Sequence, residues 1–123
     1  MLGRRHTRAL VDASAAHVYG AAIAAAADRE AAADVTHEVM VAAAAGRARA
    51  DARSLIERAV LRAVQRAPHA TFAAMREEDR EAVALARLAG YSVDEVADAL
   101  AIPPAEARSR MRNGVRALAA AVR

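Results

Sequence analysis

The stretch that decides the fold runs from Arg80 to Leu118 and reads REAVALARLAGYSVDEVADALAIPPAEARSRMRNGVRAL. Its apolar residues recur at helical spacing, with one turn at Gly90 and another before a pair of prolines. Ser92 followed by Glu95 is a capping box, which marks the start of a short middle helix. The pattern predicts a helix-turn-helix whose last helix is long and carries four arginines. In such motifs the second helix of the pair lies in the major groove of DNA.

Composition indicates an all-helical chain. The 123 residues are 56% hydrophobic but only 2% aromatic, and alanine supplies most of the apolar residues. Alanine favours helix more than any other residue but buries little surface, so we expect an all-α fold with a thin core. The formal net charge is +3, and arginine supplies all of the basic charge because there is no lysine. Arginine makes bidentate contacts with phosphate and guanine, which suits a nucleic-acid partner. The absence of lysine itself is better explained by codon usage in a GC-rich genome, so the positions of the arginines carry more weight than their number.

In the N-terminal half, the sequence predicts a loose basic arm from Met1 to Arg8 followed by three helices. The first is expected over residues 9–27. Aspartates that suit N-caps, Asp28 and Asp51, begin the next two, which end near residues 45 and 67. One stripe of the first helix holds Leu10, Ala13, His17 and Gly20 or Ala21. The apolar face of the third holds Leu55, Ile56, Ala59, Val60, Ala63 and Val64.

A domain boundary is expected at residues 68–74, because this stretch has weak helical periodicity and begins with Pro68. We therefore predict an N-terminal helical domain over residues 1–67 and a C-terminal domain over residues 75–123. Each domain is expected to contain three helices. The three C-terminal helices are expected near residues 76–89, 92–100 and 103–122.

The last helix separates an apolar face from a basic one. The apolar residues expected in the core are Ala107, Met111, Val115, Leu118 and Val122. Arg108, Arg112 and Arg116 follow one another at four-residue steps on an adjacent face, with Arg110 between the two faces. No acidic residue follows Ala107, whereas residues 77–98 hold seven carboxylates. This polarity is typical of a phosphate-binding surface, and a solvated amphipathic helix is the alternative interpretation.

The C-terminal segment resembles region 4 of bacterial sigma factors, especially the extracytoplasmic-function group. The residues that carry the resemblance are Arg80-Glu81-Ala82, Leu85, Gly90-Tyr91-Ser92, Glu95-Val96-Ala97, Leu100, Ile102-Pro103 and Arg108-Ser109-Arg110. The resemblance implies binding to the −35 element of promoter DNA and to the flap of RNA polymerase. It places Glu106, Arg108, Ser109, Arg110 and Arg112 on the groove side, and we expect Arg116 to contact the DNA backbone.

The N-terminal half resembles a degenerate copy of region 2 of the same family. The resemblance rests on Asp12 to Tyr19, on Asp28 to Ala31 and on Ala33 to Met40. It implies that the last two of these segments belong to the part that contacts core RNA polymerase. The residues placed in that contact are Asp34, Val35, His37, Glu38 and Met40.

Three departures from the family pattern bear on function. Members usually carry aromatic residues on the helix that opens the promoter, whereas residues 53–66 contain none. Single-stranded bases are normally held by aromatic stacking, so promoter melting is in question. Glu106 replaces a usual threonine, and its carboxylate would repel a nearby phosphate. Ala101 occupies a turn position where glycine is common, which costs on the order of 1 kcal/mol if the turn needs positive φ.

Three functions remain open from the sequence. The first is a small, atypical sigma factor that binds core RNA polymerase and promoter DNA. The second is a sigma-like interaction protein, an adaptor or a decoy for an anti-sigma factor, that does not melt promoters. The third is a stand-alone helix-turn-helix regulator that dimerises through its alanine-rich helices.

Other function classes are not expected. The four histidines, His6, His17, His37 and His69, lack metal-ligand spacing, and glycine patterns for phosphate loops or dinucleotides are absent. We therefore expect that the protein has no enzymatic activity and binds no cofactor or small-molecule substrate. The chain has no cysteine and no apolar run that approaches a membrane span, so we expect a cytoplasmic protein without a membrane partner.

Overall fold

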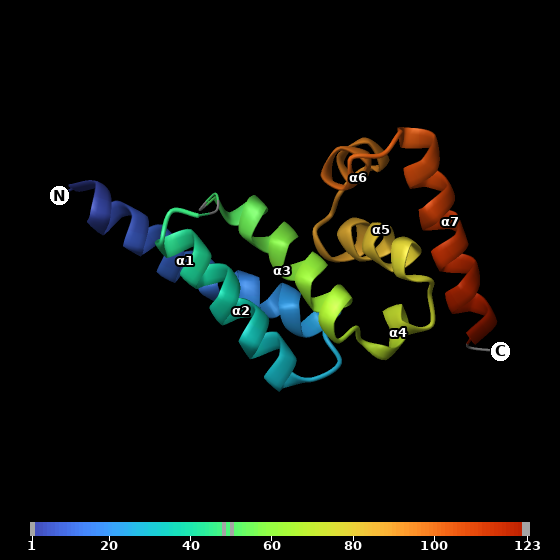
Figure 1. Ribbon diagram of the computed structural model, residues 1–123, viewed down its shortest axis with the longest axis horizontal. Helices are drawn as coiled ribbons and strands as arrows, with labels where there is room; N and C mark the ends of the chain where they lie inside the picture. Colours follow the sequence, from blue (N-terminus) through green and yellow to red (C-terminus); the bar gives the residue numbers. More distant parts are fainter. Residues whose placement is uncertain (1, 48, 50, 122–123) are drawn as a thin grey trace.

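The computed structural model describes residues 2–47, 49 and 51–121, with side chains described from residue 14 onward in these ranges. This part of the chain is helical apart from one isolated bridge between Ala26 and Pro68, which confirms the predicted all-α fold. Figure 1 shows the helices in chain order. They are α1 (Leu2–Ala25), α2 (Arg29–Ala44), α3 (Ala52–Arg66), α4 (Ala70–Ala73), α5 (Glu77–Leu88), α6 (Val93–Leu100) and α7 (Pro104–Ala121).

Helices α1, α2 and α3 pack into a three-helix bundle at the N-terminal end of the molecule (Figure 1). Both predicted aspartate caps are confirmed. The Asp28 carboxylate accepts a hydrogen bond from the Ala31 backbone N–H at 2.8 Å, and Asp51 accepts one from the Ser54 N–H at 3.0 Å. These bonds satisfy backbone donors that a helix N-terminus leaves free, so they define where α2 and α3 begin.

The core consists mainly of small aliphatic side chains. Its largest fully buried members are Leu55, Leu85, Val18, Val35, Val60, Val64 and Val96. All six residues predicted for the apolar face of α3 are buried or half-buried. Because each alanine buries little apolar surface, stability depends on many close contacts between helix backbones rather than on a few large side chains.

Helix α5 lies at the centre of the C-terminal half, and α4, α6 and α7 all pack against it (Figure 1). Four consecutive residues, Ala82 to Leu85, are buried. Successive residues of a helix point 100° apart, so a run of four buried residues means that the middle turn of α5 is covered on all sides. It is covered by α3 of the N-terminal bundle as well as by α7.

The two halves are joined along one continuous hydrophobic core, in which α3 packs against α5. The connection between them is also held by backbone hydrogen bonds. The Ala27 N–H donates to the Ala67 carbonyl at 2.7 Å, and the His69 N–H donates to the Ala25 carbonyl at 2.8 Å. The segment predicted as a linker contains α4, whose Phe72 is buried. The division into domains at this segment stays a prediction.

The N-terminal arm was predicted incorrectly. The structure shows helix from Leu2 rather than a loose segment up to Arg8. Leucine and arginine are good helix formers and this segment has no proline, so nothing interrupts the helix. The stripe predicted for α1 is also wrong at His17, which is exposed, because Ser14, Val18 and Ala22 face the core instead. Leu10 and Ala13, predicted on the same stripe, lie outside the described side chains.

The core face of α7 differs from the prediction at one position. Ala107 is fully buried, and Met111 and Leu118 are half-buried, as expected, but Val115 is 48% exposed. Gly114 takes the place predicted for Val115, because the helix is rotated so that this glycine faces α5. The prediction relied on the spacing of apolar side chains, so it could not identify a glycine that packs through its backbone. Val122 lies outside the described residues.

The turn between α6 and α7 contains a strained residue. Ala101 has a φ of 55° and a ψ of 46°, in the left-handed region that the sequence analysis considered for this position. Its N–H lies 3.3 Å from the Asp98 carbonyl, and the Ile102 N–H donates to the Ala97 carbonyl at 3.0 Å. These bonds close the end of α6 in the manner of a helix C-terminal cap. Glycine would adopt the same conformation without the steric cost of a Cβ atom.

We predict that Ala101→Gly stabilises the protein by about 1 kcal/mol, because it removes the strain of a left-handed alanine. The measurement is the free energy of unfolding in urea. Ala33→Gly is the matched control: this exposed alanine lies inside α2, where glycine should destabilise by about 0.5–1 kcal/mol. Equal destabilisation by the two substitutions would show that the turn does not need this conformation.

Candidate nucleic-acid interface

The helix-turn-helix is formed by α6 and α7, and α5 packs against both of them. The capping box predicted at the start of α6 is confirmed. The Ser92 N–H donates to Glu95 Oε1 at 2.9 Å, and the Glu95 N–H donates to Ser92 Oγ at 3.2 Å. The chain then turns at Ala101, and α7 begins at Pro104. Proline suits this first helical position because its ring already has a helical φ.

Gly114 allows α7 to lie close against α5. A Cβ atom at this position would lie 2.5 Å from Val83 Cγ2 and 3.1 Å from Met75 Sδ. Both neighbours are themselves buried, so they have little room to move. Together with the fully buried Ala107, this contact holds the position and rotation of α7. The sequence signal for it was a glycine inside a helical pattern, which often marks close packing.

We predict that Gly114→Ala destabilises the protein by about 1–3 kcal/mol, since the added methyl group overpacks the contact with Val83. Chemical denaturation measures the effect. Gly20→Ala is the control, because a Cβ there meets nothing within 4 Å and alanine should stabilise α1 by roughly 0.5–1 kcal/mol. A neutral or stabilising Gly114→Ala would show that α7 does not pack this closely.

One face of α7 is exposed and basic. Arg108, Ser109, Arg112 and Arg116, all predicted as DNA-binding residues, are exposed on it. Among the described residues, no carboxylate lies within 4.0 Å of the guanidinium groups of these three arginines. Their charges are therefore available to an anionic partner. Because successive helix residues point 100° apart, Arg116 lies opposite the buried Ala107, and Arg108 lies on a flank of the helix.

Arg110 lies in a different environment from the other three arginines. Its side chain is 23% exposed, and its Nη2 donates to Glu106 Oε1 at 2.6 Å, one helical turn earlier. Burial raises the pKa of the carboxyls of Asp79 and Glu81 on α5 above its usual value, and the charge of Arg110 opposes this only weakly. The polar contact of Arg110 is therefore made within α7 itself. Glu106 itself is exposed.

The residues predicted to contact RNA polymerase lie on α2 but do not share one surface. Asp34 and His37 are exposed, Met40 is half-buried against the core, and Val35 is fully buried. Glu38 faces α3, where it lies 3.0 Å from Arg62 Nη2 and 3.8 Å from Arg66 Nη2. Val35 and Glu38 therefore hold α2 in the bundle, and Asp34 and His37 form its accessible part.

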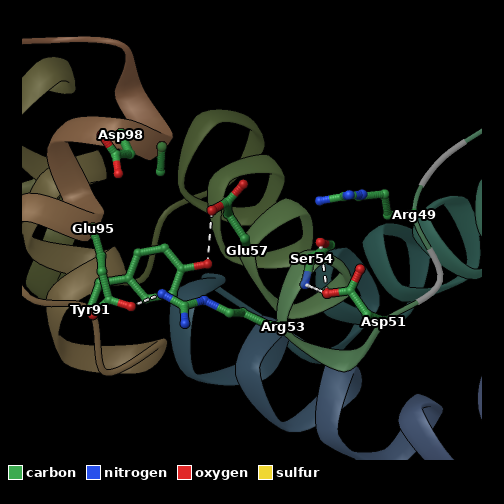
Figure 2. Close-up of a pocket in the computed structure, with 9 residues that line it drawn as sticks. Arg49, Asp51, Arg53, Ser54, Glu57, Tyr91, Glu95 and Asp98 are labelled. Carbon is green, nitrogen blue, oxygen red and sulfur yellow. Dashed lines mark hydrogen bonds and ion pairs between the residues drawn. The ribbon is translucent and has the colours of Figure 1, made fainter.

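A polar contact that the sequence analysis missed joins the bundle to the start of α6 (Figure 2). The Tyr91 hydroxyl donates to Glu57 Oε1 on α3 at 2.8 Å. The Arg53 guanidinium lies 4.6 Å from the centre of the Tyr91 ring and forms an ion pair with Glu95, the capping-box residue. Burial raises the pKa of Tyr91 above its usual value. Tyr91 was noted only for the family resemblance, because nothing in the sequence pairs α3 with this turn.

Other kinds of site receive little support from the geometry. Within the described ranges, no three His, Asp or Glu side chains gather closely enough to hold a metal ion. A hollow of about 230 Å³ lies between α4, α5 and α7, and its lining is largely apolar. No helix in the part of the chain that is described has the length and apolar character needed to cross a membrane.

Comparison with known families finds a match in the C-terminal half. The family described as "Sigma-70, region 4" matches residues 69–118, which comprise α4 to α6 and most of α7. The match therefore includes the helix-turn-helix, the supporting helix α5 and the exposed arginines of α7. Neither the curated proteins nor the solved structures contain a match to the chain.

Proposed function

We propose, from the sigma-70 region 4 type domain that residues 69–118 form, that this protein binds duplex DNA through α7 and acts in transcription initiation as an atypical small sigma factor. The observation that carries the proposal is the exposed basic face of α7, within the segment that matches the family. The N-terminal part of such a helix contacts base edges in the major groove. The site for this protein would be promoter DNA, at the −35 element.

The arginines of α7 would make different contacts with DNA according to their positions along the helix. Arg108 and Arg112 are near the start and middle of the helix and would contact bases or phosphates. Arg116 is two turns beyond Arg108 and would hold the DNA backbone. Arg110 is half-buried and engaged with Glu106, so its main role would lie within the protein.

Core RNA polymerase is the protein partner in this proposal, and an anti-sigma factor is a further partner. Asp34 and His37 supply the accessible part of the α2 surface that would face polymerase. Met40 would add a smaller apolar contact beside them. Such a protein would work in the cytoplasm, where polymerase and promoter DNA are found.

A second function is favoured by the composition of α3. Helix α3 contains no Trp, Tyr or Phe. Without aromatic stacking, a displaced single strand would be held weakly. This supports a sigma-like adaptor, which would bind polymerase or an anti-sigma factor without opening the promoter.

We predict that Arg108→Ala weakens specific DNA binding by about 1–3 kcal/mol if Arg108 reads a guanine. If Arg108 contacts only phosphate, affinity should fall evenly across sequences and the salt slope should decrease by about one. Fluorescence anisotropy over a range of salt concentrations separates these cases. Arg29→Ala, a change at an exposed arginine on α2, is the control and should have little effect. Unchanged binding by Arg108→Ala would show that α7 presents another face to DNA.

The experiment that tests the proposed function is binding of the full chain to core RNA polymerase, followed by run-off transcription from genomic fragments. Polymerase binding with promoter-dependent transcripts that Arg108→Ala reduces is the expected result for a sigma factor. Binding without transcripts would support the adaptor. Absence of polymerase binding would overturn the sigma factor and the polymerase adaptor. It would leave the decoy for an anti-sigma factor, or a dimeric regulator if the DNA footprint is symmetric.

A further inference from the structure

Glu106 has an unusual position for an acidic residue in a DNA-binding helix. It is the third residue of α7 and the acidic residue in the first turn of this helix. Its side chain is 47% exposed. The neighbouring Ala107 is fully buried, which holds this turn against the domain. Arg108 and Ser109, which follow, are exposed. Glu106 therefore lies at the end of α7 that would enter the groove, and Ser109, three residues on, is its neighbour on the helix surface.

The ion pair with Arg110 both holds Glu106 and offsets its charge. Arg110 Nη2 donates to Glu106 Oε1 at 2.6 Å. Arg110 is the less exposed partner, at 23% against 47% for Glu106. The hydrogen bond joins the two side chains across one turn of α7. The pair uses one carboxylate oxygen, so Oε2 remains as a hydrogen-bond acceptor.

An ionised carboxylate can only accept hydrogen bonds, which limits what it can recognise in DNA. Phosphate oxygens are acceptors and repel it. In the major groove the donors are the exocyclic amino groups of cytosine and adenine. Adenine places its N7 acceptor beside its amino group, whereas cytosine presents N4 alone, so cytosine is the better match for a carboxylate.

We propose that Glu106 is a specificity-determining residue that selects a cytosine at one position of the DNA site. The inference rests on the proposed function, because it requires α7 to lie in the major groove. It differs from the simple expectation that Glu106 repels phosphate. Repulsion would lower affinity for every sequence, whereas base reading lowers affinity for every sequence except those with cytosine at the contacted position.

The test is selection from a randomised duplex library by the full chain and by two variants, Glu106→Gln and Glu106→Thr. The wild-type protein should prefer cytosine at one position by about 5- to 100-fold over the other bases. Glutamine pairs with adenine, so Glu106→Gln should move the preference at that same position from cytosine to adenine. Glu106→Thr should remove the preference there and leave the other positions unchanged. It should also bind unselected DNA at least as tightly as the wild type.

The control is Glu30→Gln, which removes an exposed carboxylate from the first turn of α2, in the N-terminal bundle, and should select the same site as the wild type. If the wild type and Glu106→Gln select the same base at every position, Glu106 does not read DNA, although the proposed function stands. If the wild type selects no sequence at all, the proposed function fails and this inference fails with it. Far-UV circular dichroism of each variant confirms that the helices are intact.

Discussion

The packing of α5 on all sides is the constraint on which the rest of the structure depends. One side of this short helix receives α3 of the N-terminal bundle, and another receives α7. Its apolar side chains are small or medium in size, with Leu85 the largest that is fully buried. Neighbouring helices can therefore approach closely, and Gly114 on α7 brings one of them closest. The basic face of α7 is exposed because the opposite side of that helix is fully used in this packing.

The same packing explains why the four arginines of α7 are not equivalent. A helix that buries Ala107 and Gly114 must place residue 110 near α5, whose first turn is acidic. Arg110 is thereby turned away from the basic face and pairs with Glu106, which stays exposed. Arg108, Arg112 and Arg116 lie farther round the helix and stay exposed. The rotation of α7 about its axis therefore decides which of its arginines pairs within the protein and which remain exposed.

Local patterns in the sequence predicted much of the fold, because caps and turns depend on residues close together in the chain. Asp28, Asp51 and the Ser92–Glu95 box all begin helices as expected. The errors lie where an alanine-rich helix offers several similar faces, as at His17, or where glycine replaces a side chain, as at Gly114. Tyr91 with Glu57 could not be foreseen, since contacts between distant segments leave no local pattern. For the candidate site, the arginines were identified but the pairing of Arg110 was not.

The contact of α3 with Tyr91 and Glu95 bears on how a DNA-binding half could work within this chain. Glu95 accepts a hydrogen bond at the start of α6 through one oxygen and pairs with Arg53 through the other. The cap of a helix in the helix-turn-helix is therefore also a contact with the N-terminal bundle. Exposed ion pairs of this kind contribute little alone, roughly 0–1 kcal/mol. The continuous core between α3 and α5 adds the larger part, so the bundle and α7 keep one relative orientation. In the proposed function, polymerase-facing and DNA-facing surfaces would then be presented together, and a partner that needs them farther apart would have to break the α3–α5 packing first.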